Sequence, residues 1–401
     1  MADGASARLT EQATDMDIAQ FRAELHAWLD EHADEVALQY SEPGTLKDRL
    51  DQIRRIRGLL YDAGFMRYGW PERVGGLGGP AMMRTELNAA ISGRGLSDPG
   101  TASLVEVLGP TMVDYAPPEL AAEMMPKLLS GEELWCQGFS EPGSGSDLAS
   151  LSCRATPNLG PNGGDPETAT SWTINGQKVW TSIADFSERC VLLTRTGTPE
   201  SRHRAITAFF VDMDTPGITR RPIEMINGEA EFCEVFFDDV QVPADRICGG
   251  VNSGWAVAMS ILPFERSSCF WAWVSYEQFK LQQAVELAPD DDRAAEALGN
   301  GYLQWYALRA RSRLTQLRMA AGEPLGAETS VDKVLVAMSE HAVYDAARKV
   351  LGGGVEIDDD PAAEVWRTGW LYSRASTIYG GTAEVQRNII ARRLLELGDE
   401  A

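Results

Sequence analysis

The chain has 401 residues, of which 44% are hydrophobic and 24% charged, and its formal net charge is −23. This length exceeds one ordinary hydrophobic core and indicates two or three domains. The acidity, with no run of Lys or Arg longer than a pair, argues against binding to a nucleic-acid backbone or an anionic membrane.

The first part of the chain is expected to be helical. Residues 1–15 are small and polar, lack the features of a signal peptide, and are interpreted as a flexible tail. An N-terminal helical domain is predicted for residues 16–132, with a break at Pro43 and Gly44. It rests on two sets of apolar residues at helical spacing: Ile18, Phe21, Leu25, Trp28 and Leu29, then Leu46, Leu50, Ile53, Ile56, Leu59 and Leu60.

Strand and turn signals dominate residues 133–249, which are predicted to form a β domain. Short β-type runs occur at 190–193, 208–211 and 234–237, and residues 157–166 read as a surface loop. The run 172–174 and the pair Val179-Trp180 flank Asn175-Gly176, a dipeptide that favours a tight turn. We therefore expect a β-hairpin there.

Helical periodicity returns after Gly250, and residues 250–401 are predicted to form a C-terminal helical domain. Four periodic stretches cover about residues 254–286, 294–321, 331–351 and 363–397, and three glycines at 352–354 separate the last two. The order is helical, then β, then helical.

The six cysteines are widely spaced and form no C-x-x-C pair, which is typical of reduced packing thiols. Four scattered histidines do not suggest a metal site. No stretch approaches the apolar length of a membrane span. A cytoplasmic protein is therefore expected.

Residues 138–148 (GFSEPGSGSDL) alternate glycines with serines. Backbone amides in such a loop can converge on an anion or a carbonyl oxygen. A tight loop capped by Ser146 or Asp147 is the plainer alternative, and spacing alone does not decide between the two.

This segment resembles the flavin-contacting signature of acyl-CoA dehydrogenases. Further stretches resemble the same family in the same order, and together the likeness extends from about residue 16 to 397: WPERVGGLG at 70–78, INGQKVWTS at 174–182, EVFFDDVQVP at 234–243 and TIYGGTAEVQR at 377–387. The resemblance implies an α+β fold with an N-terminal helical domain, a central β-barrel-like domain and a C-terminal four-helix bundle. It also implies FAD-dependent α,β-dehydrogenation of an acyl-CoA thioester.

Matching positions imply roles for individual residues. Phe139, Ser140, Gly145 and Ser146 match positions that line the flavin ring, and Trp180 and Ser182 match its aromatic wall and a neighbouring hydroxyl. An indole offers a flat apolar face to a flavin, although a tryptophan packed in a core is the alternative. Thr382 and Glu384 match positions near the flavin phosphates and ribose. So do Lys349, which precedes the glycine run, and Gly353 within it.

The reaction needs a base for the α-proton while a hydride leaves the β-carbon for flavin N5. In much of the family a carboxylate follows the tyrosine of the C-terminal motif, but here that residue is Gly380. A variant solution places a glutamate before an arginine on the first helix after the β domain, and Glu265-Arg266 matches it. Glu265 is therefore the candidate base, and the alternative is that it is an ordinary solvated glutamate on a helix. Arg266 is either a catalytic residue or an ion-pair partner.

Two further departures concern FAD. The Arg-x-x-Phe-Gly motif of many members is replaced by LAPDDDR at 287–293, and a frequent glutamine is replaced by Lys349. The resemblance implies an electron-transferring flavoprotein as acceptor and a homotetramer, or a heterotetramer in which a related subunit completes the site. A flavin oxidase or monooxygenase on the same fold, and a flavin-poor partner subunit, are the alternative functions.

Overall fold

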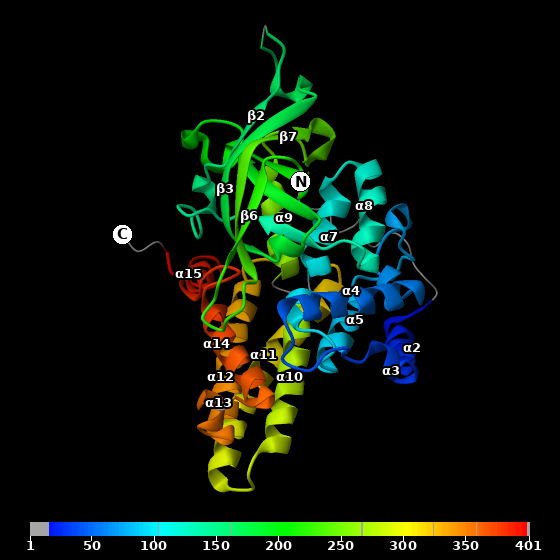
Figure 1. The fold of residues 1–401 in the computed structure, drawn as a ribbon, viewed down its shortest axis with the longest axis vertical. Coiled ribbons are helices and arrows are strands. Elements are labelled where there is room, and N and C mark those ends of the chain that lie inside the picture. Colours follow the sequence, from blue (N-terminus) through cyan, green and yellow to red (C-terminus); the bar gives the residue numbers. More distant parts are fainter. Residues whose placement is uncertain are drawn as a thin grey trace. The chain divides into compact units, whose positions relative to one another are not determined.

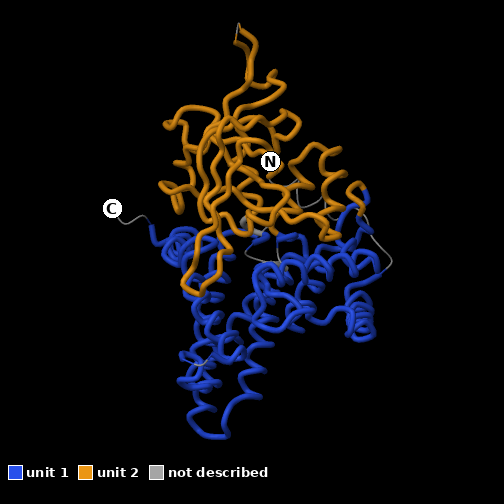
Figure 2. Tube along the Cα trace, in the orientation of Figure 1, with its two compact units in different colours: residues 1–72, 76–106, 263–401 blue, residues 73–75, 107–262 orange. Residues whose placement is uncertain are grey.

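The computed structural model describes residues 16–398 except Ser103, Asn162, Arg266, Ser267, Pro324 and Asp358. The chain divides into two compact units, which Figure 2 shows in different colours. The helical unit contains the described residues of Met1–Glu72, Gly76–Glu106 and Pro263–Ala401, and the sheet unit contains those of Arg73–Gly75 and Val107–Leu262.

The helices expected near the N-terminus are present. In α2 (Ile18–Glu31) the residues Phe21, Leu25 and Leu29 are buried, so the periodic apolar face is the packed one. The helix α4 (Leu46–Asp62) begins with a capping box between Thr45 and Asp48, which satisfies backbone donors at the helix start. The remaining elements of this region are α3 (Ala33–Val36), η1 (Phe65–Arg67), η2 (Glu72–Val74), α5 (Met82–Gly93), α6 (Pro99–Ala102), α7 (Leu104–Tyr115) and α8 (Pro118–Ser130).

An eight-stranded mixed sheet forms the centre of the sheet unit, in the order β6-β7-β3-β2-β4-β5-β8 with β1 paired to β4. One face buries a core around Trp172, Phe209 and Phe237. The three β-type runs expected from the sequence all lie in strands. The strands are β1 (Trp135–Gly138), β2 (Arg154–Pro157), β3 (Ser171–Ser182), β4 (Arg189–Arg195), β5 (Ile206–Asp212), β6 (Ile218–Ile223), β7 (Phe232–Pro243) and β8 (Ile247–Cys248).

The hairpin expected at Asn175-Gly176 is wrong, because β3 runs straight through this dipeptide and pairs with β7 along most of its length. The pairing has a register shift between Ile174 and Gly176, a β-bulge. Gly176 has φ +147°, and a β-carbon there would lie 2.7 Å from Cys153 Cα. Long-range strand pairing and this close approach require the glycine, rather than a local turn.

The C-terminal part of the chain is helical, as expected, and the long helices α10, α11 and α12 lie side by side (Figure 1). Two expected stretches are divided. Residues 254–286 contain two helices, with Arg266 and Ser267 between them outside the described residues. The helices are α9 (Gly254–Glu265), α10 (Ser268–Leu287), α11 (Asp292–Ala320), α12 (Thr329–Leu351), α13 (Gly354–Ile357), α14 (Pro361–Ser373) and α15 (Ala383–Arg393).

The single helical stretch expected over residues 363–397 is also wrong. After α14 the chain makes a 3-10 turn, η8 (Arg374–Thr377), and then passes through Gly380 at φ +64° and Gly381 at φ +92°. These left-handed conformations cannot continue a helix. The apolar periodicity on both sides gave no sign of the turn, which carries the Tyr379-Gly380 position of the C-terminal motif.

The six cysteines are free and buried, which confirms them as packing thiols. In the described part of the chain, no helix combines the length and the apolar character needed to cross a bilayer.

Candidate active site

In the sheet unit, the glycine-serine loop follows β1 directly. A side chain at Gly138 would lie 2.7 Å from Leu192 Cδ1, so the glycine lets the strand leading into the loop pack on β4 without moving Leu192. Glu141 and Ser144 then exchange two backbone hydrogen bonds of 3.0 Å each, which closes a tight turn. Added β-carbons at Gly143 and Gly145 would meet no atom within 4 Å, so this side of the loop is open.

A buried ion pair holds the loop against β3. The ammonium of Lys178 donates to the carbonyl of Phe139 at 3.0 Å and to Glu141 Oε1 at 2.8 Å. The Glu141 carboxylate also accepts from the backbone amides of Ser152 at 2.7 Å and Cys153 at 2.9 Å. Burial opposes ionisation of this carboxyl, but Lys178 and the Ser152 donors outweigh it, and the pKa of Glu141 lies below its usual value.

Trp180 stands beside this loop on an irregular part of β3. The register shifts between Lys178 and Thr181, and Trp180 has φ +59°. Its indole is 59% exposed and meets the Phe232 ring edge-on at 6.0 Å, so it is not a core tryptophan. The Val179 amide donates to the Ser140 carbonyl at 2.9 Å, which ties strand and loop together.

These features fit the ring system of a flavin. An exposed flat indole and an open glycine loop leave space for a planar aromatic group, and backbone amides in such a loop suit its carbonyl oxygens. The predicted residues of this unit lie in the loop after β1 and on β3, which the Val179–Ser140 and Lys178–Phe139 hydrogen bonds join. Phe139, Ser140 and Ser182 are half-buried, whereas Gly145 and Ser146 are exposed.

Lys178 and Glu141 had no role in the sequence analysis, although both lie inside the quoted motifs. The available signal was a lysine at a buried strand position and a glutamate at a buried loop position. Charges are almost never fully buried unless they are paired, so these two residues could have been predicted to form an ion pair.

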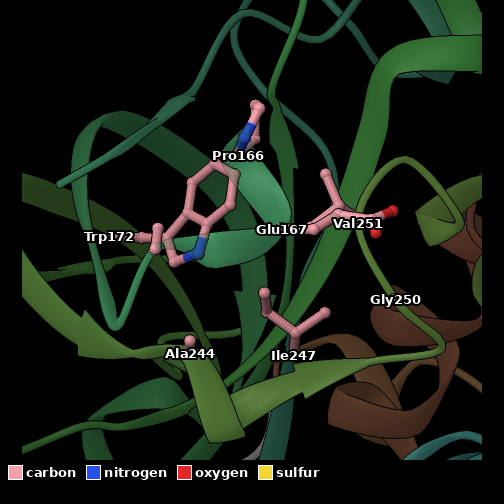
Figure 3. Close-up of a pocket in the computed structure, with 8 residues that line it drawn as sticks. Pro166, Glu167, Trp172, Ala244, Ile247, Gly250 and Val251 are labelled. Carbon is pink, nitrogen blue, oxygen red and sulfur yellow. The ribbon is translucent and has the colours of Figure 1, made fainter. Parts of the chain in front are cut away.

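A cavity in the sheet unit lies elsewhere, between η4 (Pro166–Thr168), β3 and the segment after β7. Its volume is about 380 Å³. Trp172, Ala244, Ile247 and Val251 line its walls (Figure 3). None of the residues predicted for the site lines it.

In the helical unit, Glu265 and Gly380 lie together. A β-carbon built on Gly380 would stand 2.6 Å from Glu265 Oε1 and 3.8 Å from its Cδ. The carboxylate, carried by the last residue of α9, thus occupies the place where a side chain at 380 would begin. Glu265 is half-buried, and its neighbour Arg266 lies outside the described residues.

Two residues that the sequence analysis missed surround this pair. Lys333 of α12 places its Cε 3.1 Å from the same β-carbon position and donates from its amine to the Ser376 carbonyl. Glu340, about two turns further along the same face of α12, accepts from the Tyr379 hydroxyl at 3.4 Å. Both occupy the buried stripe of α12 among Val336, Ala337 and Tyr344, so two charges on an apolar helix face were the available signal.

Burial raises the pKa of the Glu340 carboxyl to about 7, although Ser376, Lys333 and Tyr379 all oppose the shift. On the facing helix α10, burial also raises the pKa of Glu277 well above its usual value, and the hydroxyl of Ser339 donates to this carboxyl. The helical unit therefore buries two carboxyls whose pKa values burial raises.

The other predicted cofactor residues of this unit lie at the start of α15 and near the end of α12. Thr382 caps α15 by accepting from the Val385 amide at 3.2 Å, and Glu384 is exposed in the first turn of that helix. Lys349 is exposed near the end of α12, and a β-carbon on Gly353 would meet no atom within 4 Å.

Comparison with known proteins follows the same order along the chain. Models of the acyl-CoA dehydrogenase N-terminal, middle and C-terminal domains match residues 15–132, 136–240 and 252–395. The chain belongs to the acyl-CoA dehydrogenase family. Members of this family are flavin-dependent oxidoreductases that dehydrogenate acyl-CoA thioesters, so the chain is an enzyme of this class.

Several relatives cover nearly the whole chain. Acyl-CoA dehydrogenase IpdE1 of Mycobacterium tuberculosis is 36% identical, over 96% of this chain and 99% of that protein. The human mitochondrial short-chain specific acyl-CoA dehydrogenase is 28% identical, over 86% of this chain and 82% of that protein.

Solved structures show the fold. A structure described as the Tcur3481-Tcur3483 steroid ACAD has a TM-score of 0.78 at 23% identity, and covers 97% of this chain and 100% of that chain. The ChsE4-ChsE5 complex of Mycobacterium tuberculosis has a TM-score of 0.77 at 23% identity, and covers 97% and 100%. The predicted helical, sheet and helical order is confirmed.

Proposed function

We propose that this acyl-CoA dehydrogenase uses FAD and that Glu265 removes the α-proton of the acyl thioester. The observation that carries the proposal is the position of the Glu265 carboxylate at the point where a side chain on Gly380 would begin. In relatives with a base at the position of Gly380, a carboxylate starts from that point. A carboxylate that arrives from α9 reaches the same place from another element.

The residues of this chain have separate tasks in the reaction. Glu265 accepts the α-proton, and contact with an apolar acyl chain moves such a carboxyl toward the proton affinity that a base needs. FAD, when bound, supplies the acceptor for the hydride that leaves the β-carbon. Phe139, Ser140, Trp180 and Ser182 would hold its ring, with Gly145 and Ser146 in the open loop.

The phosphate and ribose contacts are proposed for Lys349, Gly353, Thr382 and Glu384. Lysine meets a phosphate as a point charge, and the amides at the start of α15 favour anions. Arg266 is proposed as an ion-pair partner of the base or as a second catalytic group.

The test is the visible spectrum of the chain purified alone, before and after anaerobic addition of an acyl-CoA mixture. A yellow protein that bleaches on addition of substrate supports the proposal. A flavin that stays oxidised with every acyl-CoA, or that is reduced only by substrates without a thioester, contradicts it. Rapid oxygen consumption by the reduced protein would favour the oxidase alternative.

A second acyl-CoA dehydrogenase chain is proposed as a partner, in addition to an electron-transferring flavoprotein. The segment that in many relatives carries a cofactor-binding arginine here contains Asp290, Asp291 and Asp292, and Asp291 caps α11 by accepting from the Ala294 amide at 2.7 Å. Three carboxylates repel a diphosphate. Two similar solved structures are described as two-protein assemblies, so a heterotetramer is proposed ahead of a homotetramer.

Flavin content distinguishes these assemblies. The partner proposal predicts substoichiometric FAD in the chain expressed alone and one FAD per completed site after co-expression with a related subunit. Full FAD occupancy in a homotetramer contradicts it and leaves the assignment of Glu265 untouched.

A further inference from the structure

Three segments of the helical unit meet at Gly380: the end of α9, the middle of α12 and the turn that follows η8. The β-carbon position of Gly380 lies 2.6 Å from Glu265 Oε1 and 3.1 Å from Lys333 Cε. The candidate base and the end of a buried lysine therefore flank the same point.

Lys333 is almost completely buried, with 2% of its surface exposed. Its amine donates to the Ser376 carbonyl and lies 4.8 Å from the centre of the Tyr379 ring. A carbonyl and an aromatic face each stabilise a cation, but taking an ammonium out of water costs several kcal/mol. A carboxylate nearby is needed to offset that cost.

Glu340 supplies this negative charge only in part. The charge of Lys333 acts on Glu340, yet burial keeps the pKa of that carboxyl at about 7, so much of it is protonated at neutral pH. Burial also raises the pKa of Glu277 well above its usual value, and this carboxyl accepts from the Ser339 hydroxyl. Asp332 pairs with Arg311 at 3.4 Å and accepts from Thr315 at 2.9 Å. Among the described carboxylates, the half-buried Glu265 also lies beside Lys333, since both side chains flank the β-carbon position of Gly380.

We propose that Lys333 is the positioning residue of the base: it ties the turn at 376–380 to α12 and keeps the Glu265 carboxylate ionised until substrate is bound. The inference rests on the proposed function of Glu265. A positive charge within a few ångströms favours the ionised form of a carboxyl and opposes the effect of an apolar acyl chain. Through the hydrogen bond to Ser376, the same lysine fixes the backbone that leaves room for the carboxylate.

Other charged or titratable groups face this cluster, and each must be separated from Glu265 in any pH profile. The helix α15 contributes the neutral side chain of Gln386, which donates to the Gly381 carbonyl at 3.3 Å. The ionisable groups are Glu277 of α10, Arg311 of α11, Asp332, Glu340 and His341 of α12, Arg374 of η8 and Tyr379 of the turn.

The activity test measures anaerobic reduction of the bound flavin by acyl-CoA as a function of pH, in the holoenzyme. Lys333→Gln keeps a donor for the Ser376 carbonyl but removes the charge. We expect the acidic limb of the reduction rate to move up by about one pH unit, which lowers the rate about tenfold on that limb, with little change in KM. Lys333→Arg, which keeps the charge, should restore the limb. Glu340→Gln should leave the limb in place if Glu265 sets it.

The matched control is Lys280→Met. Lys280 of α10 is equally buried, with its amine 3.1 Å from Gln283 Oε1 and 4.5 Å from the Trp366 ring centre. The inference is overturned if the acidic limb of the reduction rate lies at the same pH in Lys333→Gln as in wild type and Lys280→Met. If Glu265→Gln still blocks reduction in that case, the assignment of the base survives.

A second measurement needs no catalysis. The melting temperatures of Lys333→Met, Glu265→Gln and the double variant form a cycle that isolates the interaction of the two side chains. If the two side chains interact favourably, the double variant should lose less melting temperature than the two single variants lose together. Additive losses would contradict the inference even if Lys333→Gln were inactive through misfolding.

Discussion

The carboxylate of Glu265 stands where the side chain of residue 380 would start: its Oε1 lies 2.6 Å from the β-carbon position of Gly380. Real β-carbons are not found that close to another atom, so a side chain at 380 is excluded unless the end of the flexible Glu265 side chain moves away. The glycine at 380 therefore leaves open the space that the Glu265 carboxylate occupies.

Substitution of Gly380 by alanine tests this exclusion. The residue has φ +64°, and the added methyl group would press on Glu265 and Lys333, so we expect a loss of about 1–2 kcal/mol in the free energy of unfolding. Flavin reduction by substrate should also slow, because the carboxylate is displaced. Denaturant unfolding and anaerobic reduction give the two readings.

Gly299→Ala is the matched control, since a β-carbon on this exposed residue of α11 would meet no atom within 4 Å. It should stabilise the protein by up to about 1 kcal/mol and leave reduction unchanged. Equal effects of the two substitutions would show that position 380 has no special constraint.

The Lys178–Glu141 pair is predicted to hold the flavin loop in place. Lys178→Met leaves the Glu141 carboxylate buried without its cation, which typically costs about 3–5 kcal/mol, and the protein should lose FAD more easily. Flavin release during thermal melting, followed by fluorescence, measures both effects.

A neighbouring exposed pair provides the comparison. Arg202 lies 2.6 Å from Asp147 with both side chains more than half exposed, and Arg202→Ala should cost at most about 1 kcal/mol and keep the flavin. Normal flavin retention by Lys178→Met would refute the positioning role of the pair.

The raised pKa of Glu340 leads us to expect that the free energy of unfolding depends on pH. Its pKa is about 7 in the folded protein against 4.5 for the free side chain, so the folded state binds more protons between these values. The stabilisation from this group is complete below about pH 4.5 and is lost as pH rises to about 7. Glu340→Gln mimics the protonated form and should gain stability relative to wild type between pH 5 and pH 8, by up to about 3 kcal/mol.

Melting temperatures at the two pH values check this, with Glu296→Gln on the exposed face of α11 as the control. A difference between Glu340→Gln and wild type that is the same at pH 5 and pH 8 would mean that Glu340 does not titrate in this range.

Apolar spacing in the sequence correctly predicted the helices and strands whose burial is periodic along the chain. The helices at 18–31 and 46–62, and the strands around 190–193 and 208–211, follow directly from apolar spacing. Asn175-Gly176 led to a wrong prediction, because a dipeptide that favours a turn is equally suited to a β-bulge when β7 pairs with β3. The turn at 374–382 was hidden by helical periodicity on both sides of it.

The candidate site was predictable only where family motifs carried it. Glu265, Gly380 and Trp180 came from resemblance, and for the first two the structure adds the physical reason that joins them. Lys333, Glu340, Lys178 and Glu141 were missed, since apolar spacing does not say which of the charges on a buried face will find a partner. Their partners come from other segments of the chain and are visible only in the fold.

The most direct test of the account is anaerobic mixing of Glu265→Gln holoenzyme with acyl-CoA, followed at the flavin absorption band beside wild type and Glu296→Gln. We predict that the variant keeps its flavin with a normal oxidised spectrum and that its reduction slows by about 10²-fold or more, because the proton acceptor is gone. Reduction of Glu265→Gln at the wild-type rate would contradict the assignment of the base.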